Sequence, residues 1–169
     1  SEELYFPGGP LELIRYWSER MDAKASAHLA GLDLGAVKIR DKVTAGVLAR
    51  LEAIGPHEEA ARRALSRLSL PDGFPQAAAQ LWASADTIWR GIGDTSTDGN
   101  YYSKRTILSG VYSATLLFWL GDESEGAEAT WAFLSRYPGN CQVLAASAIF
   151  PAVCKRAGRS AAKPSRLLC

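Results

Sequence analysis

The sequence predicts an all-α fold, a bundle of six helices joined by short loops. Apolar residues recur at intervals of three and four, as in Leu11, Ile14, Trp17 and Met21. No segment alternates between apolar and polar residues for long enough to indicate a strand. Glycine and proline residues divide the 169-residue chain into helical segments, and its length suits a single domain.

Three helices are expected in the first half of the chain. Pro10 suits the first position of a helix because its missing N–H has no partner to lose there, and Gly31 ends this helix. Asp33 can cap a second helix, which ends at Gly55-Pro56. A third helix is expected over residues 56–70. Two glutamates lie near its start, where the positive end of the helix dipole stabilises negative charge.

Three further helices are expected in the second half. Pro75 begins a fourth helix, which the glycines at 91 and 93 end. Asp98 can cap a fifth helix that runs to about Leu120. A sixth helix opens at Ser124 and stops at Pro138.

Charge is distributed unevenly, although the whole chain carries a formal net charge of only +1, which gives no reason to expect nucleic acid as a partner. Residues 137–169 contain five basic residues and no acidic one. We therefore expect residues 138–169 to form a basic, divergent and partly disordered tail. Weak peripheral contact of this tail with an anionic membrane is one possible consequence.

Residue patterns for catalysis or metal binding are missing, so we expect neither enzymatic activity nor a metal cofactor. His28 and His57 lack the glutamate three residues earlier that a di-iron bundle needs. The run from Asp94 to Gly99 matches the start of a calcium-binding loop, but Arg105 stands where that loop needs its bidentate glutamate. We interpret the acidic residues of this run as helix and turn caps.

The start of the fifth expected helix carries an unusual combination of side chains. Asp98, Tyr101, Tyr102 and Arg105 stand at positions i, i+3, i+4 and i+7, which places them on one helical face. Tyrosine and arginine together are typical of protein interfaces. The alternative is that the tyrosines are half-buried and the charged residues form a local ion pair.

The rest of this helix is apolar around much of its circumference, which indicates burial on most sides. It can be the central helix of a bundle, one wall of a lipid pocket or part of a dimer interface, and periodicity does not separate these possibilities. The apolar residues are Ile107, Leu108, Val111, Tyr112, Thr115, Leu116, Phe118 and Trp119.

Several motifs resemble one known family. Residues 93–105 (GDTSTDGNYYSKR) resemble the signature of the ninth-numbered Coq family of ubiquinone (coenzyme Q) biosynthesis accessory proteins. Residues 31–43 (GLDLGAVKIRDKV), 122–125 (DESE) and 130–134 (TWAFL) resemble flanking helix junctions of the same family. The resemblance extends from about Tyr5 to Arg136.

This resemblance implies an all-α fold similar to the C-terminal ligand and dimerisation domain of TetR-type regulators, and a homodimer. It implies a non-catalytic protein that binds a phospholipid or isoprenoid quinone intermediate and presents it to the di-iron demethoxyubiquinone hydroxylase. The docking positions of the family match Ile88, Trp89, Asp98, Tyr101, Tyr102 and Arg105. Candidates for the lipid-binding residues are Leu81, Trp82, Leu108, Val111, Tyr112, Leu116 and Trp119.

The chain also departs from the family pattern. Residues 1–9 resemble only the end of a helix-turn-helix unit, so DNA binding is not expected, and residues 10–137 form the expected lipid-binding and dimerisation domain. Gly99 stands where the family usually has an aromatic residue. Two other functions remain open: a fragment of a TetR-type ligand-sensing regulator, or a docking and dimerisation scaffold without lipid. The family implies the bacterial cytoplasm at the inner membrane, or the matrix face of the mitochondrial inner membrane.

Overall fold

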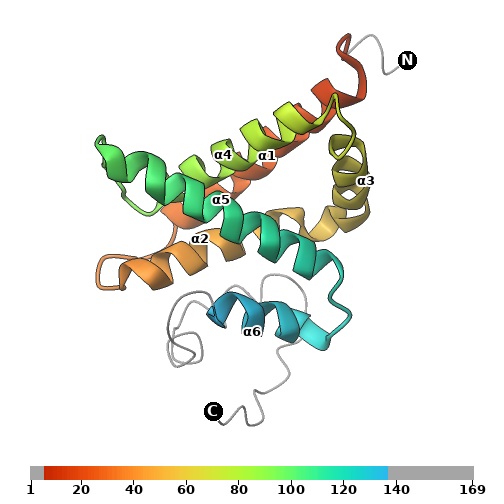
Figure 1. The fold of residues 1–169 in the computed structure, drawn as a ribbon. Coiled ribbons are helices and arrows are strands. Elements are labelled where there is room, and N and C mark those ends of the chain that lie inside the picture. The colour runs from red at the N-terminus through yellow and green to blue at the C-terminus, as the bar shows by residue number, and fades with distance from the viewer. Residues whose placement is uncertain (1–5, 137–169) are drawn as a thin grey trace.

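The computed structural model describes residues 6–136, and within this range it contains helices and no strand (Figure 1). The predicted all-α class is confirmed. The elements are α1 (Gly9–Ala30), α2 (Ile39–Ile54), the 3-10 turn η2 (Gly55–His57), α3 (Glu58–Leu68), α4 (Phe74–Gly91), α5 (Gly99–Leu120), the 3-10 turn η3 (Glu125–Ala127) and α6 (Glu128–Arg136). None of these helices is both long and apolar enough to cross a lipid bilayer.

Helices α1, α2, α4 and α5 form the body of the fold. Helix α1 packs against α2 and α4, and α5 packs against α4. Figure 1 shows α3 at one end of this body, where it connects α2 to α4, and α6 beside the C-terminal half of α5. Helix α6 therefore packs on one side of the body, against α5.

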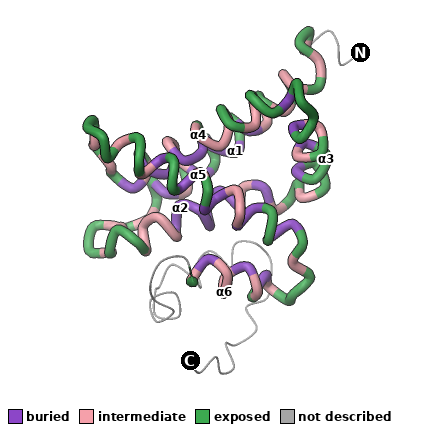
Figure 2. The backbone as a smooth tube through the Cα atoms, in the orientation of Figure 1, coloured by how far each residue is buried: buried purple, intermediate pink, exposed green. Residues whose placement is uncertain are grey.

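The hydrophobic core lies where these helices face one another, and buried residues line their inner sides (Figure 2). Helices α2 and α4 come so close that a Cβ atom at Gly46 would clash with the Ile88 side chain. Only glycine permits this approach. Helix α5 contributes Leu108, Tyr112 and Leu116 to the same core.

A charged group is buried at the centre of the body. Arg50 of α2 donates from Nε to Oδ1 of Asp22 on α1 at 2.5 Å, and Ser84 of α4 donates to the same oxygen at 2.8 Å. Burial raises the pKa of the Asp22 carboxyl, while Arg50 and Ser84 oppose this shift. These contacts join three helices through one carboxylate.

Some predicted helix starts are wrong by several residues. Asp33 does not cap α2, because its Oδ1 accepts from the backbone N–H of Gly35 at 3.3 Å and forms a local turn instead. Helix α6 begins at Glu128 rather than at Ser124, since a 3-10 turn with Gly126 at φ 65° comes first. The cap of α5 is confirmed, with Asp98 accepting from the N–H of Asn100 at 3.0 Å.

Two other expectations concern regions at the ends of the chain. The basic tail over residues 138–169 and the predicted stop at Pro138 lie outside the described residues. The helix-turn-helix remnant over residues 1–9 lies mostly outside them, and the similarity to TetR-type regulators stays a prediction.

Candidate functional site

Three aromatic side chains meet on the surface where α4 lies beside the start of α5. We call Trp82, Tyr101 and Tyr102 the aromatic cluster. The ring centre of Trp82 lies 6.4 Å from that of Tyr101 and 6.1 Å from that of Tyr102, and the two tyrosine rings meet edge to face at 5.1 Å. Tyr102 is 64% exposed, whereas Trp82 and Tyr101 are half-buried. The cluster therefore presents an aromatic surface that the protein itself supports from below.

An ion-pair group lies directly beneath the aromatic cluster. We call Asp86, Asp94 and Arg105 the brace. Arg105 is 1% exposed and donates from Nε to Asp86 Oδ1 at 2.6 Å and from Nη1 to Asp94 Oδ2 at 3.3 Å. Its guanidinium carbon lies 3.5 Å from the centre of the Tyr101 ring. The Tyr101 hydroxyl donates to Asp86 Oδ1 at 3.3 Å, so the brace holds both the ring face and the hydroxyl.

Additional donors keep both carboxylates of the brace ionised. Lys104 Nζ donates to Asp94 Oδ1 at 2.8 Å, and Ser96 donates to the same oxygen at 2.7 Å. The Lys104 hydrogen bond is the main reason that the pKa of Asp94 is lowered to about 2. Partial burial acts to raise the pKa of Asp86, but hydrogen bonds from Arg105 and Arg90 leave it below its ordinary value. Both carboxylates of the brace are therefore charged at neutral pH.

Local sequence explains why these side chains meet. Gly93 adopts φ +89° just after α4, a left-handed conformation that suits glycine and turns the chain back. Helix α5 then runs beside α4. On α4, Trp82 and Asp86 are four residues apart, and on α5 Tyr101 and Arg105 have the same spacing, so each pair occupies one helical face.

The structure separates the six predicted docking residues into two groups. Asp98 and Tyr102 are exposed and Tyr101 is half-buried, so these three are accessible to a partner. Ile88, Trp89 and Arg105 are buried, and the expectation that they contact a partner directly is corrected. Ile88 packs in the core, the Trp89 indole N–H donates to the Lys104 carbonyl at 3.1 Å, and Arg105 belongs to the brace.

The alternative expectation of a local ion pair fits Arg105, although with other partners than Asp98. Sequence reasoning missed Asp86 as one of them. A usable signal exists, because Asp86 is the only charged residue between positions 74 and 89. A lone carboxylate in such a helix generally needs a partner when it is partly buried. Asp94 was interpreted only as a helix and turn cap.

The candidate lipid-binding residues other than Trp82 belong to the hydrophobic core or pack against it. Leu108, Val111, Tyr112, Leu116 and Trp119 are buried and Leu81 packs against them. Trp82 lies in the aromatic cluster.

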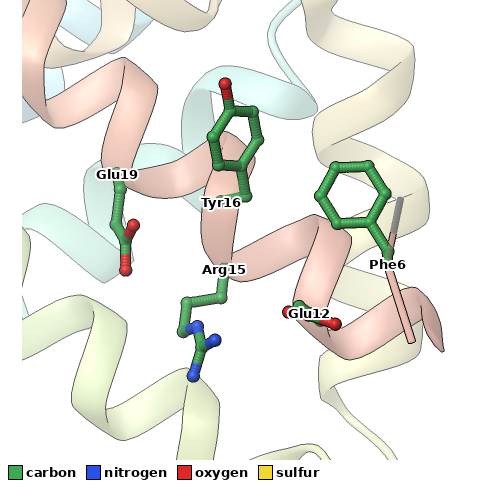
Figure 3. A pocket seen from close by; sticks show the side chains of 5 residues that line it. All are labelled: Phe6, Glu12, Arg15, Tyr16 and Glu19. Atoms are coloured by element: carbon green, nitrogen blue, oxygen red, sulfur yellow. The ribbon is translucent and has the colours of Figure 1, made fainter. Parts of the chain in front are cut away.

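Two surface pockets lie elsewhere on the described part of the chain. The first has a volume of about 530 Å³, and Figure 3 shows Phe6 and Tyr16 among the residues that line it. The ring centres of Phe6 and Tyr16 lie 5.7 Å apart. The second lies at the end of α5, where Phe118 and Asp122 contribute to its wall. Neither pocket includes a candidate lipid-binding residue. Within residues 6–136, no group of three histidine, cysteine or acidic residues could hold a metal ion.

Comparison with known protein families gives a match to the COQ9 family over residues 74–144. This range contains all of α4 and α5, and with them the aromatic cluster and the brace. The COQ9 protein of Drosophila melanogaster is also similar to the chain, with 30% identity over 133 residues, or 76% of this chain. The chain belongs to the COQ9 family. The resemblance expected from residues 93–105 is thereby confirmed.

Individual COQ9 proteins match different lengths of the chain. The mitochondrial ubiquinone biosynthesis protein COQ9 of Rattus norvegicus is 41% identical over 85 residues, which is 50% of this chain and 27% of the rat protein. The Homo sapiens protein of the same name is 40% identical over 85 residues, 50% of this chain and 27% of the human protein. The match to the Drosophila melanogaster protein covers 41% of the fly protein. The chain thus spans less than half the length of these relatives.

Proposed function

We propose that this chain acts in ubiquinone biosynthesis as a non-catalytic accessory protein, which docks the di-iron demethoxyubiquinone hydroxylase and presents a lipid intermediate to it. The observation that carries the proposal is the COQ9 family match over residues 74–144, because relatives in this family are named as ubiquinone biosynthesis proteins. The matched range includes the aromatic cluster. The resemblance in residues 93–105 points to the hydroxylase as the partner.

The aromatic cluster supports the docking part of this proposal. Tyrosine and tryptophan dominate the energetics of protein interfaces, because they bury a large area with few rotatable bonds. Here the brace already fixes Tyr101, so little side-chain freedom remains to be lost on binding. Tyr102 is the most exposed ring of the cluster and is the expected main contact.

Calorimetric titration of the chain with purified hydroxylase tests docking. We expect Tyr102→Ala to weaken binding about tenfold or more, as loss of an aromatic anchor does. Tyr16→Ala is the matched control, because Tyr16 is 50% exposed and lies on α1 outside the aromatic cluster. Equal affinities for Tyr102→Ala and the parent would reject the docking surface.

The lipid part of the proposal concerns the buried face of α5. Leu108, Val111 and Leu116 already pack against neighbouring helices, so a lipid among them requires α5 to move away from the body. Native mass spectrometry followed by solvent extraction tests this. We expect phospholipid or isoprenoid quinone to accompany the purified chain. Protein that never carries either lipid would exclude the presenting role and leave a docking scaffold.

A homodimer is the proposed assembly. The outer face of α5 carries no charged residue between positions 106 and 120, and Ile107 and Leu117 are 66% and 62% exposed on it. Gly110 and Ala114 lie between them at helical spacing, which lets a second helix approach closely. Light scattering after size-exclusion chromatography tests this. We expect a dimer for the parent and a monomer for Leu117→Arg, and a monomeric parent would reject the assembly.

We propose a mitochondrial location, at the matrix face of the inner membrane. The support is that the matching rat, human and fly relatives are named as mitochondrial proteins. Fractionation of mitochondria from the source cells, with detection by an antibody, tests this. Recovery in another compartment would contradict it.

A further inference from the structure

Arg105 lies on the helical face that carries the docking residues, yet a partner cannot reach it. We propose that Arg105 is a positioning residue, which acts on docking by holding Tyr101 rather than by contacting the partner. This inference rests on the proposed docking function. Its basis is the burial of Arg105, at 1% exposure, together with its direct contact with the Tyr101 ring.

Arg105 and Asp86 together hold Tyr101 at three points. The Arg105 guanidinium lies against its ring face, with 3.5 Å between the guanidinium carbon and the ring centre. Arg105 Nη1 also donates to the Tyr101 backbone carbonyl at 3.2 Å. The far end of the ring is fixed by the hydroxyl, which donates to Asp86 at 3.3 Å. Because Asp86 also accepts from Arg105, the contacts to the two ends of Tyr101 depend on each other.

The orientation of Tyr101 determines the shape of the whole aromatic cluster. Tyr102 packs its ring against Tyr101 edge to face, and Trp82 contacts both tyrosines. Aromatic pairs prefer such tilted arrangements, so a change in one ring changes the favourable positions of the others. Arg105 therefore influences the exposed Tyr102 through Tyr101.

Arginine is suited to this role in a way that lysine is not. A guanidinium donates hydrogen bonds in its plane while its face stacks on an aromatic ring. Arg105 uses both properties, since it pairs with Asp86 and Asp94 and stacks on Tyr101. The ammonium of lysine keeps the charge but cannot bond two carboxylates and stack in the same geometry. Arg105→Lys therefore separates positioning from charge.

A double-mutant cycle tests the proposal. Hydroxylase affinity is measured by calorimetry for the full parent chain, Arg105→Lys, Tyr101→Ala and the double variant, at a temperature where circular dichroism shows each to be folded. We expect Arg105→Lys to weaken binding about fivefold in the parent but less than about twofold when Tyr101 is already alanine, since coupled residues are not additive. An equal loss in both backgrounds would overturn the positioning role.

Arg50→Lys is the matched control. Arg50 is the other buried arginine among the described residues, and it pairs with Asp22 on α1 outside the aromatic cluster. We expect its variant to lose stability but to bind the hydroxylase within about twofold of the parent, because distant sites act independently. If Arg50→Lys weakens binding as much as Arg105→Lys, general loss of stability explains both effects and the proposal fails.

Two further variants keep the test decisive. Asp86→Asn replaces Arg105→Lys in the cycle if the lysine variant does not fold, because an amide retains an acceptor oxygen but loses the ion pair. The same non-additive result is expected with Tyr101→Ala. Tyr102→Ala separates the two proposals. Weaker binding by this variant together with an additive cycle overturns only the positioning role. Unchanged binding by Tyr102→Ala removes the docking surface and, with it, the positioning role.

Discussion

Trp89 of α4 and Lys104 of α5 are joined in two ways. The Trp89 indole N–H donates to the Lys104 backbone carbonyl at 3.1 Å, and the Lys104 ammonium lies 5.3 Å from the centre of the Trp89 ring. The Lys104 ammonium also donates a hydrogen bond to Asp94 Oδ1 at 2.8 Å. This arrangement links the core to the brace and fixes the start of α5 against the end of α4.

Trp89→Phe tests the importance of this link for stability. Phenylalanine keeps most of the apolar contact but removes the indole N–H that donates to the Lys104 carbonyl, which lies within α5. We expect the free energy of unfolding to fall by about 0.5–1.5 kcal/mol, the usual net contribution of one hydrogen bond. Urea denaturation followed by circular dichroism measures it. An unchanged midpoint would show that the hydrogen bond makes no net contribution.

The lowered pKa of Asp94 predicts a loss of stability in acid. The carboxyl has a pKa of about 2 in the folded protein against 3.8 in the reference state, so folding favours its charged form. This contribution is complete above about pH 4 and is lost as the pH falls towards about 2. Urea midpoints measured across this range should fall for the parent. Asp94→Asn should show a flatter pH dependence, and an identical slope for both proteins would contradict the assignment.

Removal of one partner from the buried Asp22–Arg50 pair should be strongly destabilising. Asp22→Ala leaves Arg50 charged in the core, which costs about 3–5 kcal/mol in typical proteins. The paired replacement Asp22→Leu with Arg50→Met removes both charges and should recover much of this loss. Thermal unfolding measures the three proteins. A double variant no more stable than Asp22→Ala would show that the pair itself, rather than its unpaired charge, is needed.

The close approach of α2 and α4 at Gly46 gives a compensation test. Gly46→Ala forces a methyl group against Ile88, and overpacking of this kind costs about 1–3 kcal/mol. Ile88→Ala in the same chain removes the clashing atoms. The two changes should therefore be less destabilising together than the sum of their separate effects. Additive losses in chemical denaturation would show that the helices shift apart instead.

Sequence patterns predicted the presence of each helix more accurately than the residue at which it begins. Asp98 and Asp33 illustrate the reason, because both are aspartates placed before an apolar helical pattern. Asp98 caps α5, but Asp33 bonds to Gly35 in a turn, and α2 starts at Ile39. An aspartate side chain favours both arrangements, and the choice depends on packing that local sequence does not contain.

Helical spacing predicted which α5 side chains of the candidate site share one face, but not which α4 residues they contact. Helical spacing placed Tyr101, Tyr102 and Arg105 near one another, but it does not indicate which side of the face turns inward. That direction depends on α4, where Asp86 provides the buried partner for Arg105. Helical spacing also did not predict the contact of Trp82 with the two tyrosines, because Trp82 lies on α4 and the tyrosines lie on α5.

Hydroxyl-radical footprinting of the chain, alone and with the hydroxylase, tests the central claim most directly. The exposed Tyr102 and Tyr16 report on the aromatic cluster and on α1 in one experiment. We expect the hydroxylase to protect Tyr102 from oxidation and to leave Tyr16 unchanged. Protection of Tyr16 with unchanged oxidation of Tyr102 would contradict docking through the aromatic cluster.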